Sequence, residues 1–222
     1  MLGRMKASLD LPPRPTLAEE LVHAVTHGVG ALLAMVTLVI LVGAVSTHGS
    51  RTAIGATLVF GASLVLLYVS STVYHAMPAR KARAKAVLQI VDHAAIHLLI
   101  AGTYTPFALC AVRGWVGWAI FGVVWSIATL GIVVETTSLR TRTRLSMGLY
   151  LGSGWLGLLL LPIAWSSLSA GALSLLVLGG FAYTAGVPFF LADSRRWTHA
   201  MWHGFVLAGS ALHVASIAIV VA

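Results

Sequence analysis

The sequence has little charge and almost no cysteine. Only 9% of its 222 residues are Asp, Glu, Lys or Arg, against about a quarter in soluble domains. The single cysteine, Cys110, excludes an intramolecular disulfide and a cysteine-rich metal site. We find no convincing internal repeat, so nothing favours a duplicated transporter architecture. These absences exclude an ordinary soluble domain and a disulfide-stabilised secreted one.

Hydrophobic residues make up 59% of the chain and occur in long runs rather than in amphipathic stripes. A run of about 20 apolar residues can cross the hydrocarbon core of a bilayer as a helix. The sequence therefore predicts an all-α integral membrane protein, a bundle of seven transmembrane helices. The predicted segments are 21–45, 53–76, 86–111, 115–135, 144–163, 167–190 and 198–221.

The sequence predicts a short N-terminal arm followed by one domain. Residues 1–19 are polar and rich in proline, and we expect them to form an N-terminal arm. Residues 20–222 are expected to form a single transmembrane domain, because short connections make neighbouring helices antiparallel. Pro106, Pro162 and Pro188 are expected to kink or end their helices.

Basic residues are distributed unequally between the two sides of the predicted bundle. Cytoplasmic loops of membrane proteins carry an excess of Lys and Arg. With seven spans, 12 of the 14 basic residues fall on the side of the N-terminus, and only Arg51 and Arg113 on the other. This asymmetry predicts a cytoplasmic N-terminus and an outer C-terminus. The net charge of +8 is thus expected to set orientation and contact lipid headgroups, not to bind nucleic acid.

Histidines gather at the predicted cytoplasmic ends of the helices. Seven of the nine lie there, and only His48 and His213 fall on the outer side. Ionisable groups within membrane spans are costly, and they usually face a partner, a cavity or the bundle interior. The layer predicts a metal site or a proton-handling site. Its candidate members are Glu20, His23, His27, His75, Asp92, His93, His97, His199 and His203.

The spacing of His199 and His203 places both imidazoles on one helix face. A catalytic zinc site needs three protein ligands and an open position. His75 is our first choice for the third ligand, since it closes its segment where the last one begins. Asp92 is the expected group beside the metal, where it could orient a ligand or hold a water molecule. Ser71 lies one turn from His75 and is expected to hydrogen-bond near the site.

Each of these residues also has a plainer interpretation. A single histidine at a membrane interface more often caps a helix end than binds a metal. A packing or hydrogen-bonding role is as strong an interpretation for His93 and His97 as a functional one. For Glu20, the competing interpretation is a first-turn carboxylate favoured by the helix dipole.

Four stretches resemble the hemolysin III family of bacterial membrane proteins, within the progestin and adipoQ receptor superfamily. They cover nearly the whole chain in order, and the third is the most specific. The chain departs from the family pattern at His23, where asparagine is common, and at His97, where an aromatic or apolar residue is expected. The four stretches are Glu20–His27, Ser71–His75, Val91–Pro106 and His199–His203.

This resemblance implies seven helices, a cytoplasmic N-terminus and zinc near the cytoplasmic face. In the related adiponectin receptors three histidines hold the zinc, and they match His75, His199 and His203. The aspartate that matches Asp92 lies close to the water on the zinc. Because His23 and His97 enrich the site in histidine, an exchange of ligands or a second metal stays open.

Several functions fit the expected site. The superfamily resembles ceramidases, which implies zinc-dependent hydrolysis of a lipid amide or ester, with a lipid or fatty acid in the bundle cavity. The alternative is a non-enzymatic sensor or receptor, stabilised by zinc and involved in membrane lipid homeostasis. A pore-forming cytolysin ranks lowest, because the spans look permanently inserted. The expected location is the bacterial cell membrane.

Overall fold

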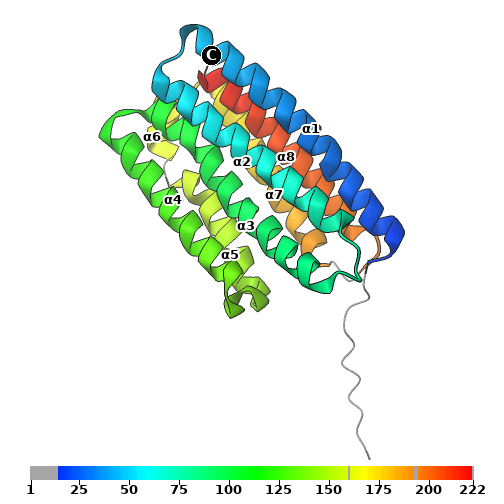
Figure 1. Cartoon of the computed structure of the whole chain (residues 1–222). Helices are drawn as coiled ribbons and strands as arrows, with labels where there is room; N and C mark the ends of the chain where they lie inside the picture. The colour runs from blue at the N-terminus through cyan, green and yellow to red at the C-terminus, as the bar shows by residue number, and fades with distance from the viewer. Residues whose placement is uncertain (1–14, 160, 193–194, 222) are drawn as a thin grey trace, which may run out of the picture.

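A computed structural model describes residues 15–159, 161–192 and 195–221, and within these ranges all regular secondary structure is helical, joined by short turns (Figure 1). The predicted arm over 1–19 lies mostly outside the described residues. The α-helices are α1 (Leu17–His48), α2 (Arg51–Ala76), α3 (Ala82–Pro106), α4 (Gly114–Thr136), α5 (Thr143–Gly154), α6 (Leu161–Ser167), α7 (Ala170–Leu191) and α8 (Thr198–Val221). Short π or 3₁₀ segments are η1 (Phe107–Val112), η2 (Ser138–Thr141) and η3 (Trp155–Leu158).

Local capping residues explain where three long helices begin. Thr16 and Glu19 form a capping box at α1, in which each side chain bonds to the backbone of the other residue. Ser50 accepts a hydrogen bond from the backbone of Ala53 at the start of α2. Ser169 does the same at the start of α7. Polar side chains thus satisfy backbone N–H groups that a helix start leaves unpaired.

Six of the described helices are long and apolar enough to cross a membrane: α1, α2, α3 together with η1, α4, α7 and α8. The shortest, α7, has 22 residues. At 1.5 Å per residue it is about 33 Å long, against a hydrocarbon core of about 30 Å. Leu33, Val36 and Ile40 lie exposed on α1, as expected for a face in contact with lipid.

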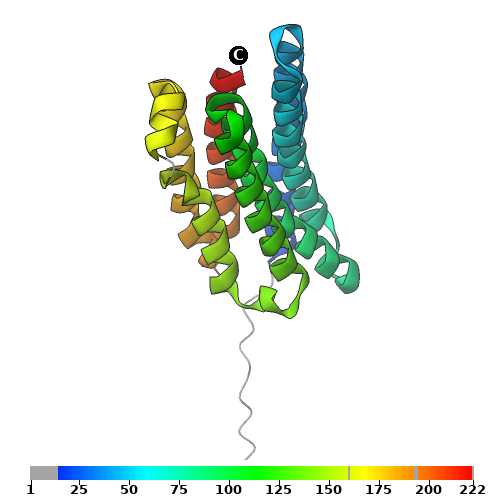
Figure 2. The same ribbon diagram turned by 90° about the vertical axis from the view of Figure 1, so that its left-hand side faces the viewer.

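The predicted fifth segment, 144–163, is not one helix. It divides into α5, η3 and α6, which follow one another along the bundle (Figure 2). Gly154 and Gly157 lie at the break, where glycine weakens a helix. The Tyr104 hydroxyl accepts a hydrogen bond from the Gly157 N–H at 2.6 Å and donates one to the Gly154 carbonyl at 2.9 Å. Tyr104 therefore satisfies backbone groups that the break frees inside an apolar environment.

The long helices run side by side along the length of the bundle (Figures 1 and 2). Helix α1 packs between α2 and α8, and α2 packs on α3. Helix α3 contacts α4 and α5, while α7 packs mainly against α8. Close approach depends on small residues: a Cβ at Gly30 would meet the Tyr68 ring, and one at Gly102 would meet Ser63.

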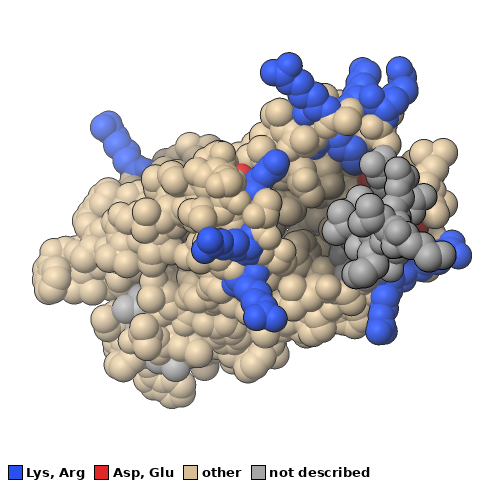
Figure 3. All heavy atoms as spheres, turned by 90° about the horizontal axis from the view of Figure 1, so that it is seen from below, with Lys and Arg blue, Asp and Glu red and all other residues tan. Residues whose placement is uncertain are grey.

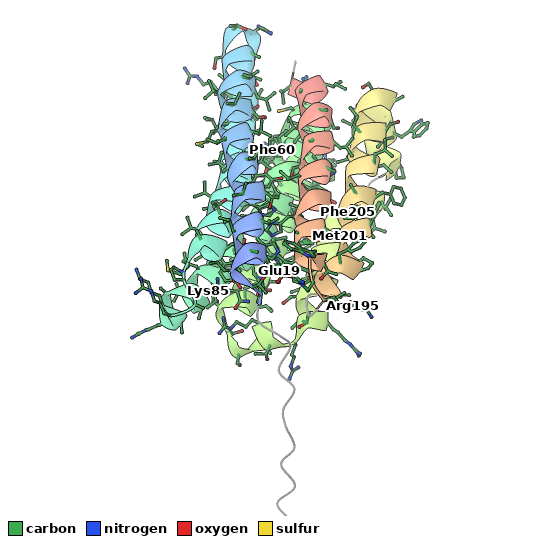
Figure 4. All side chains as sticks on the ribbon, turned by 90° about the vertical axis from the view of Figure 1, so that its right-hand side faces the viewer. Glu19, Phe60, Lys85, Arg195, Met201 and Phe205 are labelled. Atoms are coloured by element: carbon green, nitrogen blue, oxygen red, sulfur yellow. The ribbon has the colours of Figure 1, made fainter. Side chains whose placement is uncertain are left out.

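One end of the bundle carries the basic loops. We call it the basic end and define it by residues 80–85, 140–144 and 195–196. Seen from below, Lys and Arg side chains stand around this end of the molecule (Figure 3). Glu19, Lys85 and Arg195 all lie there, where α1 and α8 begin and α2 ends (Figure 4). The histidines of these helix ends are therefore brought to the same level.

Candidate metal centre

Helices α1, α2 and α8 bring five histidines together at the basic end. His23 and His27 lie one turn apart on α1, His75 lies in the last turn of α2, and His199 and His203 open α8. Side chains four residues apart share a helix face, so α1 and α8 each direct two imidazoles inward. His23, His27 and His203 are no more than 3% exposed.

Three of these histidines are close enough to bind one metal ion. One nitrogen from each of His23, His75 and His199 lies within 4.8 Å of the other two. The His203 ring lies beside them, with its centroid 4.7 Å from that of His199 and 5.1 Å from that of His75. The three predicted ligands, His75, His199 and His203, are therefore neighbours, and His23 is a fourth imidazole among them. Sets of three or four imidazoles suit zinc.

Glu20 orients the His75 ring. Its Oε2 lies 2.8 Å from His75 Nδ1, and its Oε1 accepts a hydrogen bond from Lys85 Nζ at 2.7 Å. A carboxylate only accepts hydrogen bonds, so Nδ1 of His75 carries the proton and Nε2 keeps its lone pair. That Nε2 is buried and has no hydrogen-bond partner among the described residues. A metal-ligating histidine has this arrangement, with a carboxylate on one nitrogen and the other free for the metal.

We expect Glu20→Gln to weaken metal binding by about 10- to 100-fold, because the neutral amide no longer fixes the His75 ring and tautomer. The measurement is a competition titration of purified protein with a zinc chelator of known affinity. Glu19→Gln is the matched control, since Glu19 lies next in sequence but contacts no histidine by a hydrogen bond in the described structure. Equal affinity of wild type and Glu20→Gln would contradict the role given to Glu20.

Glu19 and Glu20 both lie in the first turn of α1, where the competing interpretation placed Glu20. Glu19 closes the capping box with Thr16, and its Oε1 accepts a hydrogen bond from the Trp197 N–H at 3.1 Å. It thereby ties the start of α1 to the residue before α8. The Thr16-x-x-Glu19 spacing is the sequence signal that separates the two glutamates. Lys85 carried no such signal, because the predicted segments leave it in the loop before residue 86 among other basic residues, whereas the structure places it in the first turn of α3.

Thr26 orients His203. Its hydroxyl donates to the backbone carbonyls of Val22 at 2.8 Å and His23 at 2.9 Å, and its oxygen lies 3.2 Å from His203 Nδ1. Because the single hydroxyl proton points to the backbone, the oxygen accepts from Nδ1 of His203. Nε2 of His203 then keeps its lone pair, as in His75. The His27 ring stacks on His203 with centroids 3.5 Å apart and holds it from the other side.

Asp92 and Ser71, the residues expected beside the metal, lie next to the histidines. Ser71 is 2% exposed, one turn before His75 on α2, and Asp92 on α3 is its side-chain neighbour. Both line the same cavity as His199. The site thus brings imidazoles, a carboxylate and a hydroxyl together in one cavity.

The central cavity extends from this polar group along the bundle. It has a volume of about 210 Å³, and its lining is mostly apolar away from the histidines. Asp92 and Phe107 both line it, and 15 residues of helix separate them, which corresponds to about 22 Å. Leu173 and Val177 line it from α7. A long, mostly apolar cavity that carries imidazoles and a carboxylate at the basic end matches a molecule with an extended hydrocarbon chain and a polar head.

His93 and His97 do not join the five histidines. His93 Nδ1 lies 3.6 Å from Oε2 of Glu135 on α4. The His97 ring packs on Tyr150 with centroids 4.5 Å apart, and it fills the space that a side chain at Gly131 would occupy. The predicted layer of seven histidines is therefore divided into a group of five and a separate pair. Glu135 and Tyr150, which hold that pair, were not among the predicted site residues.

Comparison with known proteins places the chain in a family. The family described as Haemolysin-III related matches residues 16–214. The chain is 42% identical over 196 residues to the Hemolysin-3 homolog of Bacillus subtilis (strain 168), covering 88% of this chain and 91% of that protein. It is 40% identical over 194 residues to Hemolysin-3 of Bacillus cereus, covering 87% and 88%. It is 26% identical over 163 residues to the human Monocyte to macrophage differentiation factor, covering 72% and 67%. The chain therefore belongs to the hemolysin III family, within the progestin and adipoQ receptor superfamily.

Proposed function

We propose that this membrane protein binds Zn²⁺ through His75, His199 and His203 and hydrolyses an amide or ester bond of a membrane lipid. The observation that carries the proposal is the meeting of these imidazoles with Asp92 and Ser71 at the polar end of a long apolar cavity. The buried Nε2 of His75, which has no hydrogen-bond partner among the described residues, supports zinc binding.

In this proposal, the position of each residue determines its role in the reaction. Bound zinc would supply Lewis acidity, which makes a water molecule a nucleophile near neutral pH and polarises a carbonyl. Asp92 accepts the proton that the attacking water loses, and Ser71 holds the water or the carbonyl oxygen by a hydrogen bond. The apolar cavity binds the acyl chain, which places the bond to be cut next to the histidines. A released fatty acid would occupy the same cavity.

We propose that the protein crosses the bacterial cell membrane seven times, with its N-terminus in the cytoplasm. Six helices are long enough to cross as single elements, and α5, η3 and α6 together would supply the fifth crossing. Seven crossings put the described basic loops on one side, and the Lys and Arg excess makes that side the cytoplasmic one. The metal centre would then lie near the cytoplasmic face.

A second candidate function is favoured by His23. Structural zinc sites are closed by four protein ligands, whereas catalytic sites keep one position open. His23 lies 4.8 Å from His75 and from His199, and 5.3 Å from His203, between ring centroids. With His23 as fourth ligand, zinc would hold α1, α2 and α8 together in a non-enzymatic sensor of membrane lipids.

Purified wild-type protein is expected to release fatty acid from a ceramide or a related acyl lipid in detergent micelles. Removal of zinc with a chelator should stop the release, and added zinc should restore it, because the nucleophile depends on the metal. The measurement is mass spectrometry of the fatty acids against time. Release that continues at the same rate in zinc-free protein would contradict the proposal, and zinc-loaded protein without release on a lipid panel would favour the sensor.

A further inference from the structure

A second cavity lies at the basic end, between α3, the end of α4 and η2. Its volume is about 260 Å³. Arg140 and Thr141 are exposed at its rim, while Glu135 is buried inside it. We call this cavity the vestibule and define it by Gln89, Ile90, His93, Glu135, Arg140 and Thr141.

His93 separates the vestibule from the central cavity. It lines both, and its side chain is 27% exposed. The preceding residue, Asp92, lines only the central cavity of the two. The wall between the vestibule and the metal centre is therefore thin at this point and consists of an imidazole ring that can hydrogen-bond to water.

Glu135 holds His93 in this wall. Its side chain is 1% exposed, on a helix that is apolar enough to cross a membrane. Its Oε1 accepts a hydrogen bond from the Tyr150 hydroxyl at 3.2 Å, and its Oε2 lies 3.6 Å from His93 Nδ1. Tyr150 also lines the central cavity. A buried carboxylate in a membrane helix is costly, so its place at the junction of two cavities indicates a function.

We propose that the vestibule is a water entrance to the central cavity and that His93, held by Glu135, controls it. Water enters a buried space when the space offers about two to four polar partners. Gln89, Thr141 and Glu135 supply such partners in the vestibule, and His93 and Tyr150 supply them at the junction. The proposal concerns the access of water, so it stands whether the metal centre hydrolyses a lipid or only joins helices.

The test measures access to a cysteine placed beyond His93. Ile96 lines the central cavity one turn further along α3, and the single native cysteine is removed by Cys110→Ser. In nanodiscs, a small cationic methanethiosulfonate reagent reacts with Ile96→Cys, and mass spectrometry follows the rate. We expect Thr141→Trp, which narrows the vestibule, to slow this reaction about tenfold, and His93→Ala to accelerate it about tenfold, because the rate depends exponentially on the barrier to entry.

Thr52→Cys is the matched control, because Thr52 is exposed at the start of α2 and lines neither the central cavity nor the vestibule. Its labelling rate should not change with either substitution, which shows that the reagent reaches the protein equally well in each variant. Glu135→Gln provides a second way to release His93 and should accelerate labelling of Ile96→Cys as His93→Ala does. An Ile96→Cys rate that is unaffected by Thr141→Trp and by both releasing substitutions would overturn the proposal.

Discussion

His199→Ala and His75→Ala should each abolish zinc binding by the purified protein. Wild type is expected to carry about one zinc per chain, as a site with three or four protein ligands requires. Zinc in protein sites is bound with on the order of 10–16 kcal/mol, so each of about four ligands contributes on the order of 3 kcal/mol. Loss of that much weakens binding by more than about a hundredfold. Elemental analysis after gel filtration measures the zinc content directly.

His97→Phe is the matched control for these two variants. His97 is buried like the cluster histidines, but it packs on Tyr150 and lies outside the group of five. Phenylalanine keeps an aromatic ring of similar size opposite Gly131, so zinc content should remain that of wild type. Zinc-free wild-type protein, prepared without chelators, would contradict both the hydrolase and the sensor.

His23→Asn distinguishes the two zinc functions with the same measurement. The hydrolase has three protein ligands, so His23→Asn should keep its zinc and remain active. The sensor has His23 as a fourth ligand, so the same variant should bind zinc much more weakly. The ring centroids of His23 and His203 lie 4.8 Å and 4.7 Å from that of His199, so both imidazoles are within reach of a metal bound to His199.

The fold could be predicted wherever an apolar run is long and uninterrupted. The last predicted segment, 198–221, matches α8 in both bounds, because charged residues precede it and its apolar pattern continues to the end. The prediction of one helix over 144–163 was wrong, since hydropathy does not register the helix-weakening Gly154 and Gly157 or a tyrosine able to bond the broken backbone. Tyr104 lies about 50 residues from that break, and a contact of this kind has no local signal.

The sequence predicts the level of the site residues along the helices, but not which neighbouring helix each side chain faces. Counting helix ends placed the histidines at one level, yet it did not say which neighbour each one faces. His93 and His97 are four residues apart and share a face, while Asp92 points about 100° away from His93. The helical spacing therefore predicts that Asp92 and the pair His93 and His97 face different neighbours. Only the packing of α3 against α2 and α4 shows that Asp92 approaches Ser71 and His93 approaches Glu135.

Asp92→Asn is expected to stop lipid hydrolysis while zinc remains bound. Asparagine has almost the same shape as aspartate and still forms hydrogen bonds, but it cannot take the proton from the attacking water. Removal of a general base lowers the rate by about 10²- to 10⁴-fold. The measurement combines the rate of fatty-acid release with the zinc content of the same preparation. Ser71→Ala, which removes one hydrogen bond and no base, should lower the rate much less.

The paired readout makes each outcome informative about Asp92. Loss of zinc together with activity would mean that Asp92 is itself a ligand, which its position among His75 and His199 makes a specific alternative. Full activity with zinc retained would move the general base elsewhere in the cavity. The other two carboxylates near the histidines already have partners. Glu19 accepts a hydrogen bond from the Trp197 backbone, and Glu20 is bound by His75 and Lys85. Asp92, whose described hydrogen-bond partner is the Ser71 side chain, is thus the carboxylate that we expect to accept the proton of the attacking water.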